Sequence, residues 1–204
     1  MLRRAAAVAF AAILASPATA QTASKDPAQA PAGAYRLETS HSQLLFAIPH
    51  LGLTDFYGRF DKLSGTLNFD PNQPEKSAVS ITVDTTSIDT PSGALNNELK
   101  GASVFDAANF PTASFKSTSI ARTGADTGTI TGDLTIKGVT KPVTLDVVFH
   151  GGEQNPMNDS YALGFRGTAT IKRTDFGLSG MIWEPMVGND VTLIVEAMFQ
   201  QQKR

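Results

Sequence analysis

The sequence predicts an all-β protein, an eight-stranded antiparallel barrel with one short capping helix. Three observations lead to this prediction. Apolar and polar residues alternate over segments of about eight residues or more, which is typical of half-buried strands. These segments are rich in Thr, Val and Ile, and turn-forming clusters at 70–72, 123–125 and 151–152 separate them. A meander of long strands leaves exposed edges unless it closes on itself, so we expect a closed barrel.

In the first half of the chain, the alternation starts with a strand whose apolar positions 44, 46 and 48 share one face and which ends near His50. The next alternating segments, 56–60 and 65–69, face the same way on either side of an interruption, so we expect a bulge near 61–64. Two further strands follow, around 79–83 and, with a weaker pattern centred on Phe115, around 112–121.

The second half contains the clearest alternation, in four segments at 130–136, 143–149, 163–171 and 191–199. One stretch between the two halves has a different period. Residues 92–100 place Leu95 and Leu99 four positions apart, and Ser92 stands where a helix cap is expected. We therefore expect one short helix over a mouth of the barrel.

Composition fits one exported domain. The chain has 204 residues, of which 41% are apolar, so it can bury a core. Residues 1–20 have the pattern of a secretory signal peptide, with a basic start, an apolar run and a predicted cut after Ala20; a membrane anchor is the alternative. We expect a flexible leader at 21–34 and one barrel domain at 35–204. The chain lacks Cys, which excludes disulfides and thiolate-ligated metal sites.

Alternation alone does not say which face of the strands is inside. A membrane barrel would turn its apolar rows toward lipid. The absence of aromatic girdles and the mixed charges of the polar rows favour a barrel whose apolar rows face inward. Those rows also contain Gly58, Gly65, Gly132 and Gly167. These glycines either relieve strain where strands bend or leave room inside, and both interpretations stay open.

Few side chains converge in a way that suggests catalysis. We expect the three histidines in different kinds of position: His50 on an apolar face, His150 at a strand end and His41 at a strand start. Ser42 beside His41 would point to the opposite face of the strand. No nucleophile-elbow or phosphate-loop motif is present. We therefore predict no enzyme activity, no catalytic residues, no metal site and no cofactor; a hydrolase is the least favoured alternative. A pI near 5.9 argues against a nucleic-acid partner. Capture of an apolar ligand fits the Phe-rich rows better.

Six ordered motifs carry a resemblance to a known family. They are H-S-x-L-x-F-x-I-x-H-x-G from His41, G-x-F-x-x-L-x-G-x-L-x-F-D from Gly58, S-I-D-T from Ser87, V-F-D-x-x-x-F-P-x-x-x-F from Val104, G-x-L-T-I-K-G-V-T-K-P-V from Gly132 and I-K-R-T-D-F-G-L from Ile171. The chain resembles the YceI-like family over about 35–200. The resemblance implies a lipocalin-like barrel, a periplasmic or secreted location, and a lumen that binds a polyisoprenoid or an isoprenoid quinone without catalysis.

The chain departs from the family pattern at the helix. The family often has R-D-x-H-L there, whereas residues 95–99 read L-N-N-E-L, and Val104 replaces a Phe. No role of those charged and imidazole groups carries over. Arg173 does match. We expect it to tie the turn at 174–178 to the barrel, with contact to a pyrophosphate or quinone head group as the second interpretation.

We expect the bound ligand to be an apolar isoprenoid lipid held in the lumen of a periplasmic protein. A ligand-free structural or stress-response barrel is the alternative. Stable insertion into a membrane is not expected, and the sequence leaves open whether the protein is a monomer or a dimer. The predicted ligand-binding residues are Phe46, Ile48, His50, Phe56, Phe60, Leu67, Phe69, Ile81, Phe105, Phe115, Leu134, Leu145, Val147, Phe165, Arg173, Trp183 and Leu193.

Overall fold

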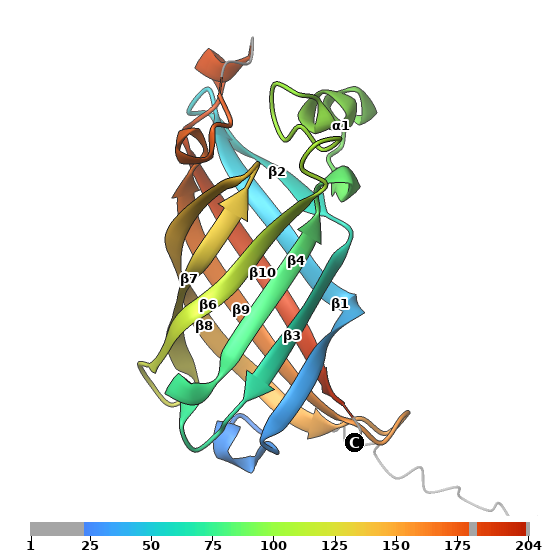
Figure 1. Cartoon of the computed structure of the whole chain (residues 1–204), viewed down its shortest axis with the longest axis vertical. Helices are drawn as coiled ribbons and strands as arrows, with labels where there is room; N and C mark the ends of the chain where they lie inside the picture. Colours follow the sequence, from blue (N-terminus) through green and yellow to red (C-terminus); the bar gives the residue numbers. More distant parts are fainter. Residues whose placement is uncertain (1–22, 180–182, 203–204) are drawn as a thin grey trace, which may run out of the picture.

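A single antiparallel sheet curls and closes on itself in the computed structural model, which describes residues 23–179 and 183–202 (Figure 1). The predicted signal peptide lies outside the described residues. The sheet order is β10-β9-β8-β7-β6-β4-β3-β1-β2-β5, and a further pairing of β10 with β1 completes the barrel. The strands are β1 (Gly33–His50), β2 (Thr54–Phe60), β3 (Leu63–Phe69), β4 (Ala78–Asp84), β5 (Ile88–Asp89), β6 (Thr112–Arg122), β7 (Thr127–Ile136), β8 (Val139–Gln154), β9 (Tyr161–Lys172) and β10 (Asp190–Gln201).

The wall has the predicted eight strand positions, because two of them are shared by consecutive strands. The first part of β1 pairs with β3 and its last part pairs with β2. The strands β2 and β3 therefore lie end to end and together occupy one strand position beside β1. The two-residue strand β5 pairs with β2 as β4 pairs with β3. The expected bulge near 61–64 is the break between Phe60 and Leu63, where β2 ends and β3 begins.

Closure depends on pairing between the two ends of the sheet. Residues 43–47 of β1 pair with 192–196 of β10, and 35–38 pair with 198–201. A bulge separates these two runs. Within it, the hydroxyl of buried Ser42 donates to the carbonyl of Glu38 (2.6 Å) and accepts from the amide of Met198 (3.0 Å). This serine therefore joins the two strands where their ladder is interrupted.

The carboxylate of Glu38 stabilises the same bulge from the outside. It accepts the amides of Ser40 (3.0 Å) and His41 (2.9 Å). Partial burial raises the pKa of Glu38, but the hydrogen bonds from Ser40 and His41 outweigh it and lower that pKa overall. The acid is therefore an anionic cap for a turn of exposed backbone.

Polar side chains occupy the outer face, so the apolar rows face inward, as the sequence favoured. Thr131 and Thr144 share a hydrogen bond across neighbouring strands (2.8 Å). Arg166 and Glu196, which are paired in register, form an exposed ion pair (3.1 Å). Among the described residues, no helix has the length and apolar character needed to span a membrane.

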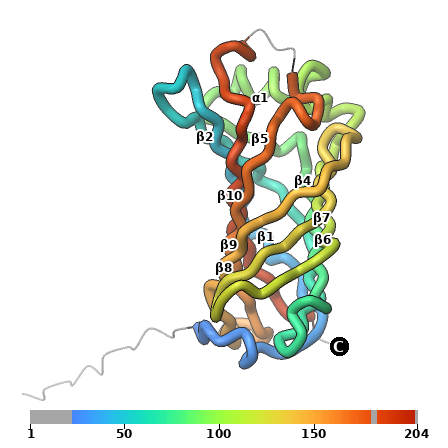
Figure 2. The backbone as a smooth tube through the Cα atoms, turned by 90° about the vertical axis from the view of Figure 1, so that its left-hand side faces the viewer, coloured from blue at the N-terminus to red at the C-terminus, as the bar shows by residue number. Residues whose placement is uncertain are grey.

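The two ends of the barrel differ. At one end, Figures 1 and 2 show the expected helix, α1 (Gly93–Lys100), with Ser92 capping it by accepting the amide of Leu95 (3.3 Å). At the other end, a cluster of aromatic rings fills the interior. Phe165 is its centre, with ring centroids 5.2–6.3 Å from those of its three neighbours Phe69, Phe149 and Phe199.

The segment expected to be a flexible leader contacts this closed end instead. Ser24 pairs with Gly152, residues 27–29 form a 3-10 helix, and Ala30 is buried. The hydroxyl of Tyr35, a fully buried residue, donates to the carbonyl of Pro31 (2.6 Å). Gly33 and Ala34 already belong to β1. Composition gave no sign of these contacts, because they depend on the shape of the barrel end.

Replacing Tyr35 by Phe tests how firmly this segment is held. Burial, with a smaller contribution from Tyr161, raises the pKa of Tyr35 to about 12. The phenol is therefore favoured in the folded state, and its stabilisation is present below the unfolded pKa of about 10 and lost as the pH rises toward about 12. We expect Tyr35→Phe to lower the free energy of unfolding by about 1 kcal/mol at neutral pH.

Urea denaturation of both proteins, from neutral pH to about pH 11, measures this difference. The difference should shrink above about pH 10, because only the wild type loses stability through this phenol. Parallel pH profiles for the two proteins would show that Tyr35 does not titrate as proposed.

Candidate functional site: an apolar cavity inside the barrel

The barrel encloses a cavity of about 470 Å³ between the aromatic cluster and the α1 end. Its wall is made by the inward-facing residues of the strands, which alternate with the outward polar residues. On the seam, Leu44 pairs with Val195 and Phe46 with Leu193, so both strands present apolar side chains to the same space. The volume lies within the usual range of ligand pockets, about 300–1,000 Å³.

The structure places the predicted residues around this cavity with one exception. Phe69 is buried in the closed-end cluster, 6.2 Å from the ring of Tyr35, and does not line the cavity. Alternation along β3 gives its face but not its depth in the barrel. The other predicted residues all line the wall: Phe46, Ile48, His50, Phe56, Phe60, Leu67, Ile81, Phe105, Phe115, Leu134, Leu145, Val147, Phe165, Arg173, Trp183 and Leu193.

Further lining residues come from α1 and the loops. Leu95 and Leu99 face the cavity from α1, where their spacing of four residues was the available signal. Val187 comes from the loop before β10 and forms an isolated bridge with His50. The sequence could not predict this role, because a single Val in a loop belongs to no alternating pattern. The cavity is therefore completed by segments whose placement only the folded chain determines.

The four glycines of the apolar rows, Gly58, Gly65, Gly132 and Gly167, have different surroundings in the barrel. Only Gly167 among them lines the cavity, so it leaves room for contents. A side chain at Gly58 would meet the ring of Phe46, and one at Gly132 would meet the carbonyl of Lys116 and the ring of Phe115. At Gly65 it would meet Ile81 and a backbone carbonyl. Three of the glycines thus accommodate neighbours, while Gly167 lines the cavity, where an added Cβ would lie 3.1 Å from the side chain of Leu145.

Polar groups are scarce on this wall. Among the described lining residues, His50, Ser114 and Arg173 carry polar side chains, together with the indole of Trp183. That indole donates to a carboxylate oxygen of Glu98 on α1. The described residues contain no group of three or more His, Asp or Glu side chains suited to a metal ion. The cavity can therefore offer apolar contact over most of its surface and only a few hydrogen bonds.

Arg173 is buried at the α1 end of the cavity, and its cation is already engaged. Its Nη1 donates to the carbonyl of Leu178 (2.7 Å) and to Glu184 (3.1 Å), and its Nε donates to the carbonyl of Gly188 (3.0 Å). It thus ties the turn after β9 to the segment before β10, which is the structural role that the sequence indicated. A buried cation with a carboxylate and two carbonyls is well compensated.

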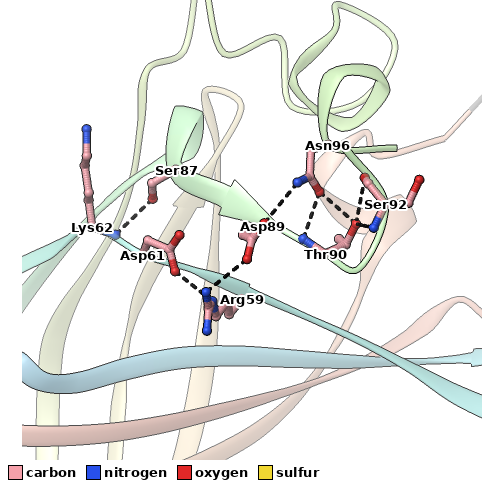
Figure 3. Close-up of polar contacts among 8 residues, drawn as sticks. All are labelled: Arg59, Asp61, Lys62, Ser87, Asp89, Thr90, Ser92 and Asn96. Carbon is pink, nitrogen blue, oxygen red and sulfur yellow. Dashed lines mark hydrogen bonds and ion pairs between the residues drawn. The ribbon is translucent and has the colours of Figure 1, made fainter. Parts of the chain in front are cut away.

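The helix is fixed to the wall by the polar network in Figure 3. Arg59 on β2 contacts Asp61 (2.8 Å) and Asp89 (3.1 Å). Asp89 accepts from the side-chain amide of Asn96 on α1 (3.1 Å), whose oxygen accepts from the amide (2.8 Å) and hydroxyl (2.7 Å) of Thr90. Because these contacts lie outside the cavity, α1 can be held over it without polar groups in the lumen.

The remaining histidines lie on the outer face. His41 is exposed and its Nδ1 is 2.6 Å from Glu38, while the Ser42 hydroxyl bonds backbone groups in the bulge. His150 lies in an exposed position near the closed end. The adjacent His41 and Ser42 therefore belong to the seam between β1 and β10, in agreement with the expectation that they do not form a catalytic pair.

The fold and the cavity together define a class of protein, the closed antiparallel barrels that enclose an apolar space. Comparison with known proteins then gives the family: residues 35–199 match the YceI-like domain, and the chain belongs to the YceI-like family. A UPF0312 protein of Ectopseudomonas mendocina is 39% identical over 153 residues, covering 74% of this chain and 80% of that protein.

Solved structures share the fold. BcnA of Burkholderia cenocepacia is similar with a TM-score of 0.70 at 27% identity, covering 79% of this chain and 98% of BcnA. A polyisoprenoid binding domain from Saccharophagus degradans is similar with a TM-score of 0.66 at 14% identity, covering 84% of this chain and all of that domain. The lipocalin-like barrel implied by the six motifs is confirmed.

Replacing Arg173 by Gln tests its structural role. The change removes the cation and the guanidinium donors from which Glu184 and the carbonyls of Leu178 and Gly188 accept. Since a hydrogen bond to a charged group contributes about 1.5–3 kcal/mol, we expect the free energy of unfolding to fall by roughly 3 kcal/mol. Lys172→Gln is the matched control, because the neighbouring Lys172–Asp190 ion pair (2.7 Å) is exposed and solvent screens it, so its loss should change the free energy of unfolding little. Equal losses in urea denaturation would contradict this assignment.

Proposed function

We propose that this protein binds a long apolar isoprenoid lipid, a polyisoprenoid or an isoprenoid quinone, in the barrel cavity and carries it without catalysis or cofactor. The observation that carries the proposal is the apolar cavity of about 470 Å³ enclosed by a closed wall. The polyisoprenoid binding domain of Saccharophagus degradans, which has the same fold, supports an isoprenoid as the ligand class.

The size of the cavity favours an occupant over a ligand-free structural barrel. Engineered cavities in protein cores cost about 24 cal/mol for each Å³ left unfilled. At about 470 Å³, an empty interior would forgo on the order of 10 kcal/mol, which is comparable to the whole stability of a typical domain. An apolar chain recovers this loss at about 0.8 kcal/mol for each buried methylene.

The polar groups of the wall favour an uncharged head group. Arg173 is compensated by Glu184, and the other polar side chains among the described lining residues are His50, Ser114 and the indole of Trp183. A pyrophosphate inside the cavity would have to give up its hydration without gaining an uncommitted arginine or lysine. A quinone or alcohol oxygen needs only a hydrogen-bond donor. We therefore favour a neutral isoprenoid over its pyrophosphate.

The same substitution on adjacent residues tests the site. Val147 lines the cavity, and the next residue, Val148, is exposed on the outer face. Val147→Asp places a carboxylate among apolar side chains, so we expect the lipid that copurifies with the protein to fall about tenfold or more. Val148→Asp should leave it unchanged. Mass spectrometry of solvent extracts measures the lipid, and circular dichroism checks the fold.

Gly167→Leu is a second variant for the case in which Val147→Asp does not fold. It fills the cavity with apolar atoms, so it should displace the lipid without introducing a charge. A folded cavity variant that retains as much lipid as Val148→Asp would contradict the proposal.

We further propose that the protein acts in the periplasm after export. The support is the signal-peptide pattern of residues 1–20, with its small residues at 18 and 20. Intact mass measurement of protein from a periplasmic extract should give a chain that begins at Gln21. A periplasmic chain that keeps residues 1–20, or a chain recovered only with the membranes, would contradict the predicted cleavage.

A further inference from the structure

Exposed apolar side chains gather beside the mouth of the cavity. Leu53 is 80% exposed and Leu51 is 57% exposed in the turn between β1 and β2, and Met186 is 42% exposed in the short 3-10 helix η5 (Glu184–Met186). We call these three residues the mouth rim. They lie at the α1 end of the barrel, since β1 ends and β10 begins there (Figure 1).

The fold holds the rim in place. The amide of Leu51 donates to the carbonyl of Met186 (2.8 Å), and the amide of Gly188 donates to the carbonyl of Pro49 (2.7 Å). Leu51 has a φ of 54°, which is uncommon for a bulky residue. The backbone bonds between the turn and η5 therefore maintain a conformation that presents leucine to the outside.

The rim is continuous with the cavity. His50 and Val187 line the cavity and pair with each other, and they are the sequence neighbours of Leu51 and Met186. Trp183, another lining residue, precedes Met186 by three positions. An apolar chain that leaves the cavity on this side therefore meets apolar side chains before it meets water.

We propose that the mouth rim docks on the surface of a lipid bilayer, so that the ligand passes between the bilayer and the cavity. This inference rests on the proposed function, because it takes the ligand to be a membrane lipid. Leucine and methionine enter the boundary between head groups and acyl chains, and tryptophan prefers that depth. The three rim side chains are uncharged, so we expect their contact with the bilayer not to depend on anionic lipid.

The area of the rim favours a bilayer over a second protein. Three side chains of this size offer roughly 300 Å², whereas a stable protein interface buries about 800 Å² on each partner. Insertion into a bilayer has no such threshold, because each apolar side chain contributes separately. Reversible contact of this kind also fits a carrier that must leave the membrane again.

Flotation with vesicles of pure phosphatidylcholine tests the proposal. The wild type should float with the vesicles, and Leu53→Asp should reduce the bound fraction about tenfold or more. Met157→Asp is the matched control, because Met157 is 90% exposed in the loop after β8, at the closed end. Trp183 is the single tryptophan of the chain, so quenching of its fluorescence by brominated acyl chains should report which end docks.

Uptake of an isoprenoid supplied in detergent separates this proposal from the proposed function, because this uptake does not depend on docking. Leu53 does not line the cavity, so Leu53→Asp should still take up the isoprenoid from detergent while it loses vesicle binding. The absence of wild-type binding would overturn the docking proposal even if the lipid is present. Equal losses in Leu53→Asp and Met157→Asp, or a dimer that Leu53→Asp dissociates, would overturn it as well.

Discussion

Closure of the sheet between β1 and β10 is the constraint on which the rest of the structure depends. The strand β1 is 18 residues long and pairs with β10 on one side and with β3 and then β2 on the other. The bulge in β1 lets the strand change direction between its pairing with β3 and its pairing with β2. At this bulge, the hydroxyl of Ser42 forms hydrogen bonds with backbone groups of both β1 and β10. Without this seam, the apolar rows of both strands would face water and no interior space would exist.

The closed wall makes an interior with two different ends. Aromatic rings packed edge-on or tilted around Phe165, together with the segment before β1, close one end, while α1 and residues 183–187 cover the other. The covering elements are held by side-chain contacts of Arg59, Asp89 and Glu98, and also by Leu99 of α1 and the following Val104, which are buried in the hydrophobic core.

The sequence predicted the architecture because alternation separates the two faces of each strand, and the mixed charges of the polar rows and the absence of aromatic girdles indicated which face is inside. The break between Phe60 and Leu63, the helix cap at Ser92 and the inward rows are all visible as local patterns. Depth along the barrel is not a local property, which is why Phe69 was assigned to the cavity and lies in the closed-end cluster. The contacts of the leader segment and the role of Val187 likewise depend on where distant strands end.

The central claim is that the barrel interior is a binding cavity and not a filled core. A crystal structure of protein purified without detergent from cells that make it tests this most directly. The account predicts continuous elongated density along the barrel axis, in contact with Phe46 and Leu193 and ending near Arg173. An interior in which those side chains meet one another and leave no space would contradict it.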